Sequence, residues 1–380
     1  MQYIVIDLEW NQSMEAGHSK KEAGPAGSPL YKIPPCEIIE IGAVKLNENF
    51  EIIGEFNELV RPRLYKQLHF ATRKVTHIKQ SELEQARGFS KVAAAFLKWV
   101  GNEKHVFCTW GSMDLTEFQR NLDYYHIRSP FQNPLLFYDL QRIYCLQYEN
   151  AIHTRSLESA VDALGIPKDI PFHRASADTY YTALVMRKLD MERYHNELTP
   201  DLHRVPRRHS EEYLLNYDDY NLYVSRAFPD AIALMLDLSI RQTPCPVCGA
   251  KAVKKIKWFS SNHDFFCMAV CKKHGLLKAK IHVKHADAGG IFGVRKVELS
   301  DEESLEQMKE RKLALAEKRR KKIRAEKEAA QAEAEAVKEP VKEKPVKEKP
   351  IKEKPVKENK KEPAKDPLRK GKKISKKRKA

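Results

Sequence analysis

The chain has 380 residues, of which 42% are hydrophobic, and it carries a formal charge of +16. That length suits one substantial domain with a smaller companion. Residues 300–380 hold 29 basic and 17 acidic side chains, so +12 of the excess charge belongs to this region. The apolar stretches are far shorter than the ~20 residues that a membrane span needs, which excludes a membrane-spanning protein. Residues 1–10 lack the features of a secretion signal, so we expect a cytoplasmic protein.

The first half of the chain alternates strand-like and helix-like segments. Residues 3–8, 37–46 and 54–60 predict the strands of a meander, and a long Gly- and Pro-rich loop is expected over residues 13–35. Helical apolar spacing follows near residues 92–100, 115–125 and 181–189, with short strand-like runs at 106–109 and 135–138. This alternation predicts an α/β layered domain over residues 1–192.

Four further regions are expected after this domain. They are a polar connector (193–242), a small cysteine-bearing domain (243–299), a charged helical segment (300–339) and a tail (340–380). The tail repeats a five-residue unit of Lys, Glu and Pro, and a proline at every fifth position prevents a continuous helix. The sequence therefore predicts a disordered basic tail, which would raise the encounter rate with a polyanion.

Four carboxylates and one imidazole occupy the ends of predicted elements. Asp7 and Glu9 lie two residues apart on the first strand, so their side chains project to the same face. Asp114 and Asp178 each lie at the start of an amphipathic helix, and Asp178 follows His173 by five residues. Such a cluster would repel itself unless divalent cations neutralised it, and oxygen ligands favour Mg²⁺ or Mn²⁺.

The chemistry that requires this set of groups is phosphodiester hydrolysis. One metal ion generates hydroxide and a second stabilises the departing oxyanion. His173 is the candidate general base, because an ordinary imidazole titrates at ~6.5 and accepts a proton near neutral pH. An Asp-x-Glu pair alone is more often a pair of solvated edge charges, so the interpretation depends on the whole set.

Residues 3–189 resemble the DEDDh exonucleases of the DnaQ/RNase T superfamily, which have an RNase H-like fold. The resemblance lies in three motifs, at residues 4–9, 108–114 and 173–178. The form of the second motif, with segments at 37–44, 60–62 and 75–78, is similar to the ERI-type RNA exonucleases and the KapD-like sporulation-pathway inhibitors. This family resemblance implies an RNase H-like mixed sheet flanked by helices.

The resemblance also implies a 3′→5′ exonuclease that releases nucleoside 5′-monophosphates from a single-stranded 3′ end, with RNA preferred to DNA. Asp7, Glu9 and Asp178 would hold one metal ion. Asp7 would bridge to a second ion, which Asp114 would hold directly or through water. His173 would be the base.

Substrate contacts are expected at Trp10, Thr76 and His77. Trp10 either stacks on the terminal base or packs in the core, and His77 is either a nucleotide contact or a plain surface residue. Two places depart from the family's usual residues: Trp10 and Asn11 after the first motif, and His77. These departures affect substrate preference more than catalysis. An alternative function is a KapD-like regulatory protein that uses the exonuclease fold as a scaffold for nucleic acid or for an unidentified protein partner.

The cysteines of the second domain have the spacing of a metal site. Cys245 and Cys248, and likewise Cys271 and His274, are separated by two residues and followed by glycine, as in zinc knuckles. Cys267 is an alternative fourth ligand, but its strand-like apolar surroundings favour burial. The pattern predicts a zinc ribbon with a closed, structural Zn²⁺.

Nine lysines lie between residues 251 and 284, interleaved with four aromatic side chains. This composition suits a nucleic-acid surface, or equally a solvated basic face over an aromatic core.

Overall fold

A computed structural model of the protein describes residues 1–13, 34–149 and 154–336. The expected 13–35 loop lies almost entirely outside the described residues, and the expected tail lies wholly outside them. Residues 1–318 form one compact unit and residues 319–380 a second. Among the helices of the described residues, none is long and apolar enough to cross a membrane.

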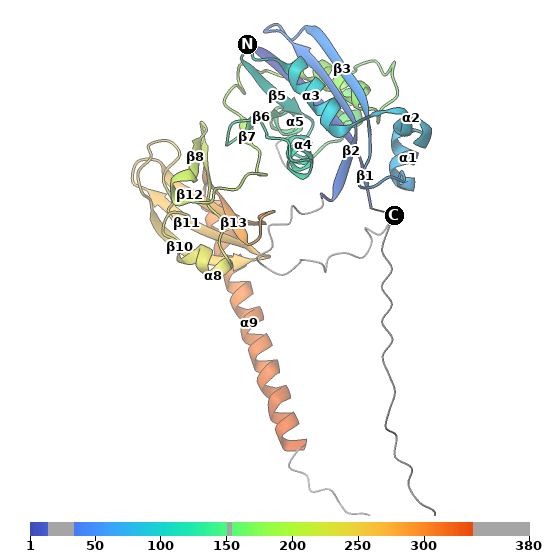
Figure 1. Cartoon of the computed structure of the whole chain (residues 1–380). Helices are drawn as coiled ribbons and strands as arrows, with labels where there is room; N and C mark the ends of the chain where they lie inside the picture. The colour runs from blue at the N-terminus through green and yellow to red at the C-terminus, as the bar shows by residue number, and fades with distance from the viewer. Residues whose placement is uncertain (14–33, 150–153, 337–380) are drawn as a thin grey trace, which may run out of the picture. The chain divides into compact units, whose positions relative to one another are not determined.

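A mixed seven-stranded sheet forms the centre of the N-terminal domain, in the order β4-β3-β2-β1-β5-β6-β7 (Figure 1). Its strands are β1 (Gln2–Gln12), β2 (Cys36–Leu46), β3 (Ile52–Arg61), β4 (Arg87–Gly88), β5 (His105–Thr109), β6 (Leu136–Asp139) and β7 (Leu198–Pro200). β1, β2 and β3 pair antiparallel, whereas β5 joins β1 in parallel and β6 joins β5 in parallel. The predicted mixed α/β sheet is therefore confirmed.

Helices cover both faces of this sheet. They are α1 (Phe70–Thr76), α2 (Gln80–Gln85), α3 (Phe89–Val100), α4 (Asp114–Tyr124), α5 (Leu140–Tyr148), α6 (Leu157–Ala163) and α7 (Ala175–Met186). On β1, Ile4 and Ile6 pack with α3 and α4, while Val5 packs with α5, α6 and α7. Because side chains alternate along a strand, Asp7 and Glu9 project to the α7 face.

Helix α7 approaches β2 closely at Gly42. A Cβ atom at this position would lie 2.3 Å from the carbonyl carbon of Ala175, the first residue of α7. Only glycine leaves room for this contact, which brings the start of α7 onto the middle of the sheet. The same turn of α7 carries Asp178.

A second, antiparallel sheet of six strands follows in the order β10-β11-β12-β13-β9-β8. Its strands are β8 (Tyr213–Asn216), β9 (Tyr220–Val224), β10 (Val253–Ser261), β11 (Asp264–Cys271), β12 (Gly275–His285) and β13 (Ile291–Leu299). The structure differs here from the predicted connector at 193–242, because β7 extends the first sheet and β8 and β9 complete the second. These strands are only three to five residues long, so their sequence resembles a linker.

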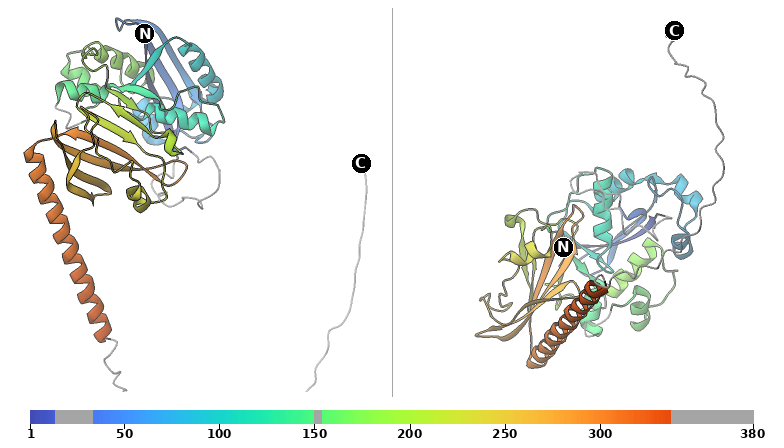
Figure 2. Two further views of the ribbon diagram at one scale, coloured as in Figure 1. Left: turned by 90° about the vertical axis from the view of Figure 1, so that its left-hand side faces the viewer. Right: turned by 90° about the horizontal axis from the view of Figure 1, so that it is seen from below.

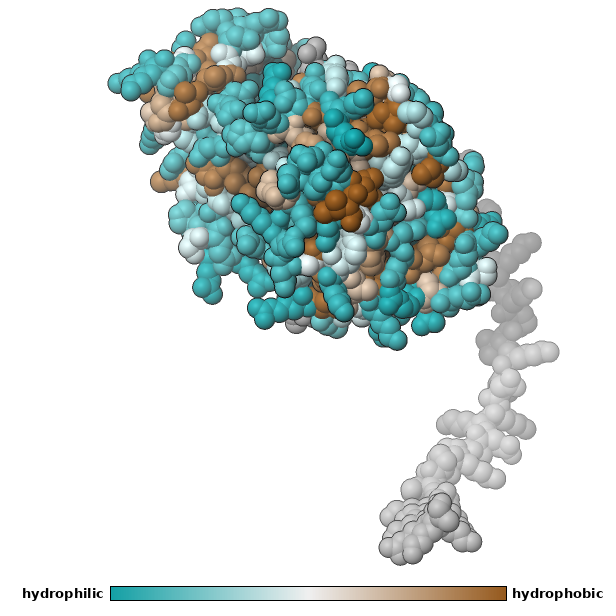
Figure 3. Space-filling view, turned by 90° about the horizontal axis from the view of Figure 1, so that it is seen from above, coloured by the Kyte–Doolittle hydropathy of each residue, from teal (hydrophilic) through white to brown (hydrophobic). Residues whose placement is uncertain are grey.

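The remaining helices are η1 (His209–Glu211), α8 (Ala231–Leu236) and α9 (Glu302–Ala336). Near its start, α9 packs Leu305 and Met308 against the second sheet. It then continues as a charged helix to Ala336 (Figure 2). Of the charged helical segment expected at 300–339, residues 337–339 lie outside the described residues. Figure 3 shows a face of the molecule on which hydrophilic side chains predominate between scattered hydrophobic ones.

Candidate active site and metal centre

The three sequence motifs meet in one pocket of about 430 Å³. Carboxylate oxygens of Asp7, Glu9 and Asp178 lie within 4.8 Å of one another. Asp114 and His173 line the same pocket, although Asp114 is not part of that closest group. The structure thus gathers all five predicted catalytic residues in one place.

Backbone hydrogen bonds position the two acids that come from helices. The Leu8 N–H of β1 donates to the Asp114 carboxylate at 3.1 Å, which ties the start of α4 to the strand that carries Asp7. The backbone N–H of His173 donates to the Asp178 carboxylate at 3.2 Å. His173 has a φ of 68°, so this contact accompanies a left-handed turn immediately before α7.

Burial raises the pKa of every carboxyl group in the cluster, and repulsion between its members raises those of Asp7 and Glu9 further. For Asp7, burial raises the pKa well above its ordinary value, and the charges of Asp114 and Asp178 raise it further. Burial likewise raises the pKa of Glu9 to about 8, of Asp114 to about 7 and of Asp178 to about 6. For Glu9, repulsion by the Asp178 charge adds to the effect of burial. The charges of Arg174 and His173 offset only part of these effects on Glu9 and Asp178, so the cluster is suited to divalent cations.

These raised pKa values predict the pH dependence of the metal-free protein. A carboxyl group with a higher pKa in the folded than in the unfolded state binds more protons when folded, so stability falls as pH rises through the folded pKa. Without divalent cations, we expect the N-terminal domain to melt at a lower temperature near pH 8 than near pH 6, the range that the pKa values of Glu9 and Asp178 span. Calorimetry with and without Mg²⁺ measures this. The ion should raise the melting temperature most near pH 8, and Glu9→Gln should flatten the slope; a slope unchanged in Glu9→Gln would contradict the assignment.

An ion pair between the buried Glu40 and the half-buried Arg174 fixes the segment between His173 and α7. The Glu40 carboxylate of β2 is 0% exposed and accepts two hydrogen bonds from the Arg174 guanidinium, at 2.8 and 3.0 Å. It also accepts a hydrogen bond from the Ala175 N–H at 3.3 Å. Since Glu40 lies opposite Glu9 in the β1–β2 pair, this contact joins the residue after His173 to the strand beside the cluster.

Removing one partner of this pair should destabilise the fold strongly. We expect Arg174→Ala to lower the free energy of unfolding by ~3–5 kcal/mol, because it leaves the Glu40 charge buried and uncompensated. Arg87→Ala is the matched control, since its partner Glu58 is on the surface and such pairs contribute ~0–1 kcal/mol. Urea unfolding measures both variants. Equal losses would show that the Glu40 carboxylate is not an isolated buried charge.

The three predicted substrate contacts do not lie together. Trp10 lines the pocket and also packs against the core on the α3 side of the sheet. Its position therefore combines the two alternatives, a ring at the substrate pocket and a ring packed in the core. Thr76 is buried, and its hydroxyl donates to the Thr72 carbonyl at 3.0 Å. His77 ends α1 with a φ of 58°. Thr76 and His77 are not among the residues that line the pocket.

Other pocket residues were not predicted as site residues. Trp110, Ser112 and Met113 line the pocket and belong to the second motif, where only the acid was given a catalytic role. The Trp110 indole N–H and the Gln141 amide both donate to the Arg155 carbonyl, at 3.1 and 2.7 Å. Gln141 also lines the pocket from α5, and nothing in its sequence surroundings distinguishes it.

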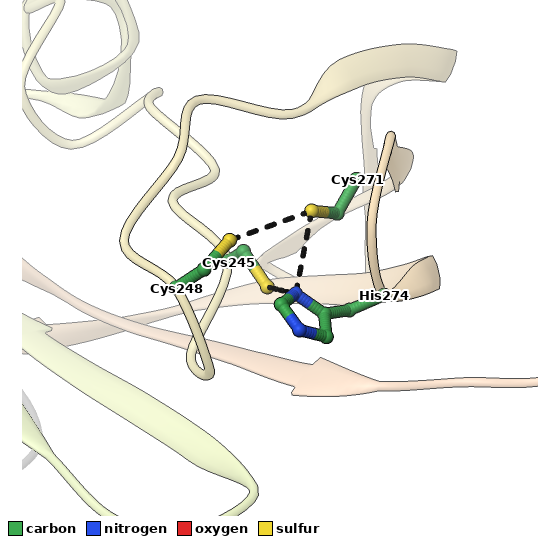
Figure 4. A group of neighbouring side chains, drawn as sticks. All are labelled: Cys245, Cys248, Cys271 and His274. Carbon is green, nitrogen blue, oxygen red and sulfur yellow. Dashed lines mark hydrogen bonds between the residues drawn. The ribbon is translucent and has the colours of Figure 1, made fainter.

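A second group of potential metal ligands lies in the C-terminal domain (Figure 4). Ligand atoms of Cys245, Cys248, Cys271 and His274 all lie within 4.8 Å of one another. The Sγ atoms of Cys248 and Cys271 are 3.7 Å apart, and the His274 Nδ1 atom is 3.4 and 3.7 Å from the Sγ atoms of Cys245 and Cys271. Tetrahedral Zn²⁺ with bonds of ~2.3 Å to sulfur and ~2.0 Å to nitrogen gives ligand separations of about 3.5–3.8 Å, so the donor set fits this ion.

Local backbone geometry supports thiolate character at Cys271. Backbone N–H groups of Lys273 and His274 point at the Cys271 sulfur and lower the pKa of its thiol to about 6. Gly275 follows with a φ of 77°, the left-handed turn expected of a knuckle. Cys267 lies outside this group, and its Sγ atom contacts the Met268 carbonyl instead.

The mixed sheet and its carboxylate-lined pocket define an RNase H-like nuclease domain. Residues 5–186 match the model of the RNase T family, which is described as an exonuclease. Residues 5–186 are therefore similar to that exonuclease family, as the sequence resemblance predicted.

Several solved structures are similar to parts of the chain. The nuclease domain of 3′hExo, a DEDDh family member bound to rAMP, is 23% identical, with 52% of this chain and 95% of that chain covered and a TM-score of 0.41. Cell-death related nuclease 4 is 19% identical over 52% of this chain and 66% of its own, with a TM-score of 0.41. E. coli Exonuclease I in complex with an oligonucleotide is 15% identical. The match covers 63% of this chain and 58% of that chain, with a TM-score of 0.40. No curated protein matches the chain. The family assignment rests on the family model.

Proposed function

We propose that the N-terminal domain is a metal-dependent 3′→5′ exonuclease that removes nucleoside 5′-monophosphates from single-stranded nucleic acid, with RNA preferred to DNA. The observation that carries this proposal is the gathering of the Asp7, Glu9 and Asp178 carboxylates within 4.8 Å, in a pocket that Asp114 and His173 also line.

The residues of this pocket have distinct tasks in the proposed reaction. Asp7, Glu9, Asp114 and Asp178 would hold two Mg²⁺ or Mn²⁺ ions, which supply an activated water and stabilise the departing oxyanion. His173 is exposed at the pocket and accepts the proton of the attacking water on its imidazole.

Two features support the preference for a single-stranded RNA end. The second motif, at residues 108–114, has the form found in the ERI-type RNA exonucleases. The half-buried Trp10 ring is available at the pocket for stacking on the terminal base, a contact worth ~1–3 kcal/mol per base. Stacking suits an unpaired end, whose bases are free to leave the helix.

Degradation of end-labelled strands tests the proposal. RNA and DNA of one sequence, labelled at the 5′ end, are incubated with Mg²⁺, with Mn²⁺ or with EDTA. We expect a ladder that shortens from the 3′ end in the presence of either ion, faster on RNA, and none with Asp178→Ala. Asp162→Ala is the control, because this aspartate of α6 pairs with Lys168 on the surface. Binding without shortening of either strand would overturn the proposal and favour the KapD-like scaffold.

We propose further that Cys245, Cys248, Cys271 and His274 hold a structural Zn²⁺. Four protein ligands leave no open position for substrate, so the ion stabilises the C-terminal domain without a catalytic role. The support is the fit of the sulfur and nitrogen separations to a tetrahedral ion, together with the lowered pKa of Cys271.

A further inference from the structure

We propose that one face of the six-stranded sheet binds the phosphate backbone of the single-stranded substrate, away from the catalytic pocket. This inference rests on the proposed function and adds a second contact region for the same nucleic acid. The region is the lysine face, defined as Lys278, Lys280, Lys284 and Lys296 on β12 and β13.

Strand register places these lysines on one side of the sheet. Lys278, Lys280 and Lys284 are separated by even numbers of residues along β12, so their side chains project to the same face, while Leu277, Ala279 and Ile281 pack beneath. Lys296 of β13 pairs directly with Lys280, which adds a fourth lysine to that face.

The pairing of Lys280 with Lys296 opposes the stability of the sheet. Like charges directly opposite each other on antiparallel strands are destabilising. Two acids offset part of this repulsion: Asp264 lies 2.9 Å from the Lys280 ammonium, and Glu298 lies 2.6 Å from that of Lys296. Glu298 is also 3.7 Å from the ammonium group of Lys278, so one carboxylate faces two lysines. Asp201 and Asp301 also act on Lys284 and Lys278, so four carboxylates face the four lysines. The excess of positive charge that a phosphate backbone complements comes from Arg311 and Lys312 of the adjoining α9.

Helix α9 extends the positive charge at the edge of this face. The Arg311 guanidinium lies 4.0 Å from the ring centroid of Phe266, and the Lys280 ammonium lies 5.7 Å from the same ring. The Lys312 ammonium lies 5.8 Å from the neighbouring Phe259 ring. A cation–π contact holds the cationic side chain over the aromatic ring and leaves its positive charge in place.

The same contacts indicate how the strand is recognised. Phe266 is only 6% exposed and is covered by cations and by α9, so its ring is not available for stacking on a base. Lysine ammonium groups bind phosphates without reading sequence. The lysine face should therefore hold RNA and DNA alike and contribute to affinity, whereas any preference for RNA arises at the catalytic pocket.

Binding of long and short strands tests this inference. The full chain carries Asp178→Asn, which prevents degradation, and is compared with and without Lys280→Gln/Lys296→Gln. Fluorescence anisotropy measures the Kd of labelled single strands of about 30 and about 5 nucleotides, between about 50 and about 200 mM salt. We expect the double substitution to weaken binding of the long strand by roughly tenfold, and to reduce the slope of log Kd against log salt by about 0.7 for each lysine removed.

Three outcomes decide the inference. The charge-matched control Lys91→Gln/Lys98→Gln removes two exposed lysines of α3. Its slope of log Kd against log salt should equal that of the parent protein within experimental error. An equal slope for the lysine-face variant and its parent would overturn the inference, as would a loss restricted to the short strand or to RNA. Failure of the proposed function is separate, because it appears as undegraded strands in the protein without Asp178→Asn, whatever the anisotropy shows.

Discussion

His173→Asn is expected to lower kcat by ~10²–10⁴ while changing KM little, because the general base acts on the attacking water in the transition state and not on the bound strand. Asparagine is chosen because it tolerates the left-handed backbone, with a φ of 68°, that His173 adopts before α7. The backbone N–H that donates to Asp178 is retained. Single-turnover degradation of a short end-labelled RNA measures the effect.

His126→Asn is the matched control for this prediction. His126 also has a positive φ, 56°, and is exposed, but it follows the C-terminal end of α4, whereas Asp114 starts that helix. We expect its rate to stay within about twofold of the parent, an ordinary result for a surface position. If both variants lost activity equally, the loss would come from the turn geometry and His173 would not be the base.

Cys271→Ser is expected to abolish zinc binding and to unfold the six-stranded domain. The binding free energy of a structural Zn²⁺ is ~10–16 kcal/mol in small domains, far more than the core around Cys271 contributes alone. Metal content by atomic absorption, with limited proteolysis of residues 243–299, measures the two effects. The seven-stranded domain should keep its melting transition, because its core clusters contain none of the four ligands.

Cys267→Ser separates the two candidate ligand sets. Cys267 is 0% exposed, and its sulfur lies outside the group formed by the other three cysteines and His274. This variant should retain one zinc ion per chain and lose only a modest part of its stability, since serine nearly matches cysteine in size. Loss of the ion in Cys267→Ser, with retention in His274→Ala, would instead identify an all-cysteine site.

The carboxylate cluster was predictable because its chemistry depends on residue type and on position along each element. The spacing of Asp7 and Glu9 fixes a shared face on any strand, and Asp114 and Asp178 each follow a recognisable element boundary. What the sequence does not contain is the tertiary contact that completes the site. The hydrogen bond from Leu8 to Asp114 joins residues 106 positions apart, and the Glu40–Arg174 pair joins residues 134 apart.

The second domain was harder to delimit for a different physical reason. Its cysteine spacing is a local signal, so the metal group stood out in the sequence. Strand β9 joins the sheet only through pairing with β13, and β8 only through pairing with β9. The residues of both strands alternate too weakly to distinguish a strand from a loop. Gln141 was missed because its place at the pocket depends on where β5 and β6 direct the chain.

The contact between Gly42 and α7 has a consequence for protein engineering and for evolution. A single added methyl group on β2 would displace the helix that carries Asp178, although position 42 is not among the pocket-lining residues. A library that randomises only the pocket would leave this dependence unseen, and a graft of the acids onto another scaffold would have to import the glycine as well. The proposed hydrolysis therefore depends also on Gly42, which contributes only by having no side chain.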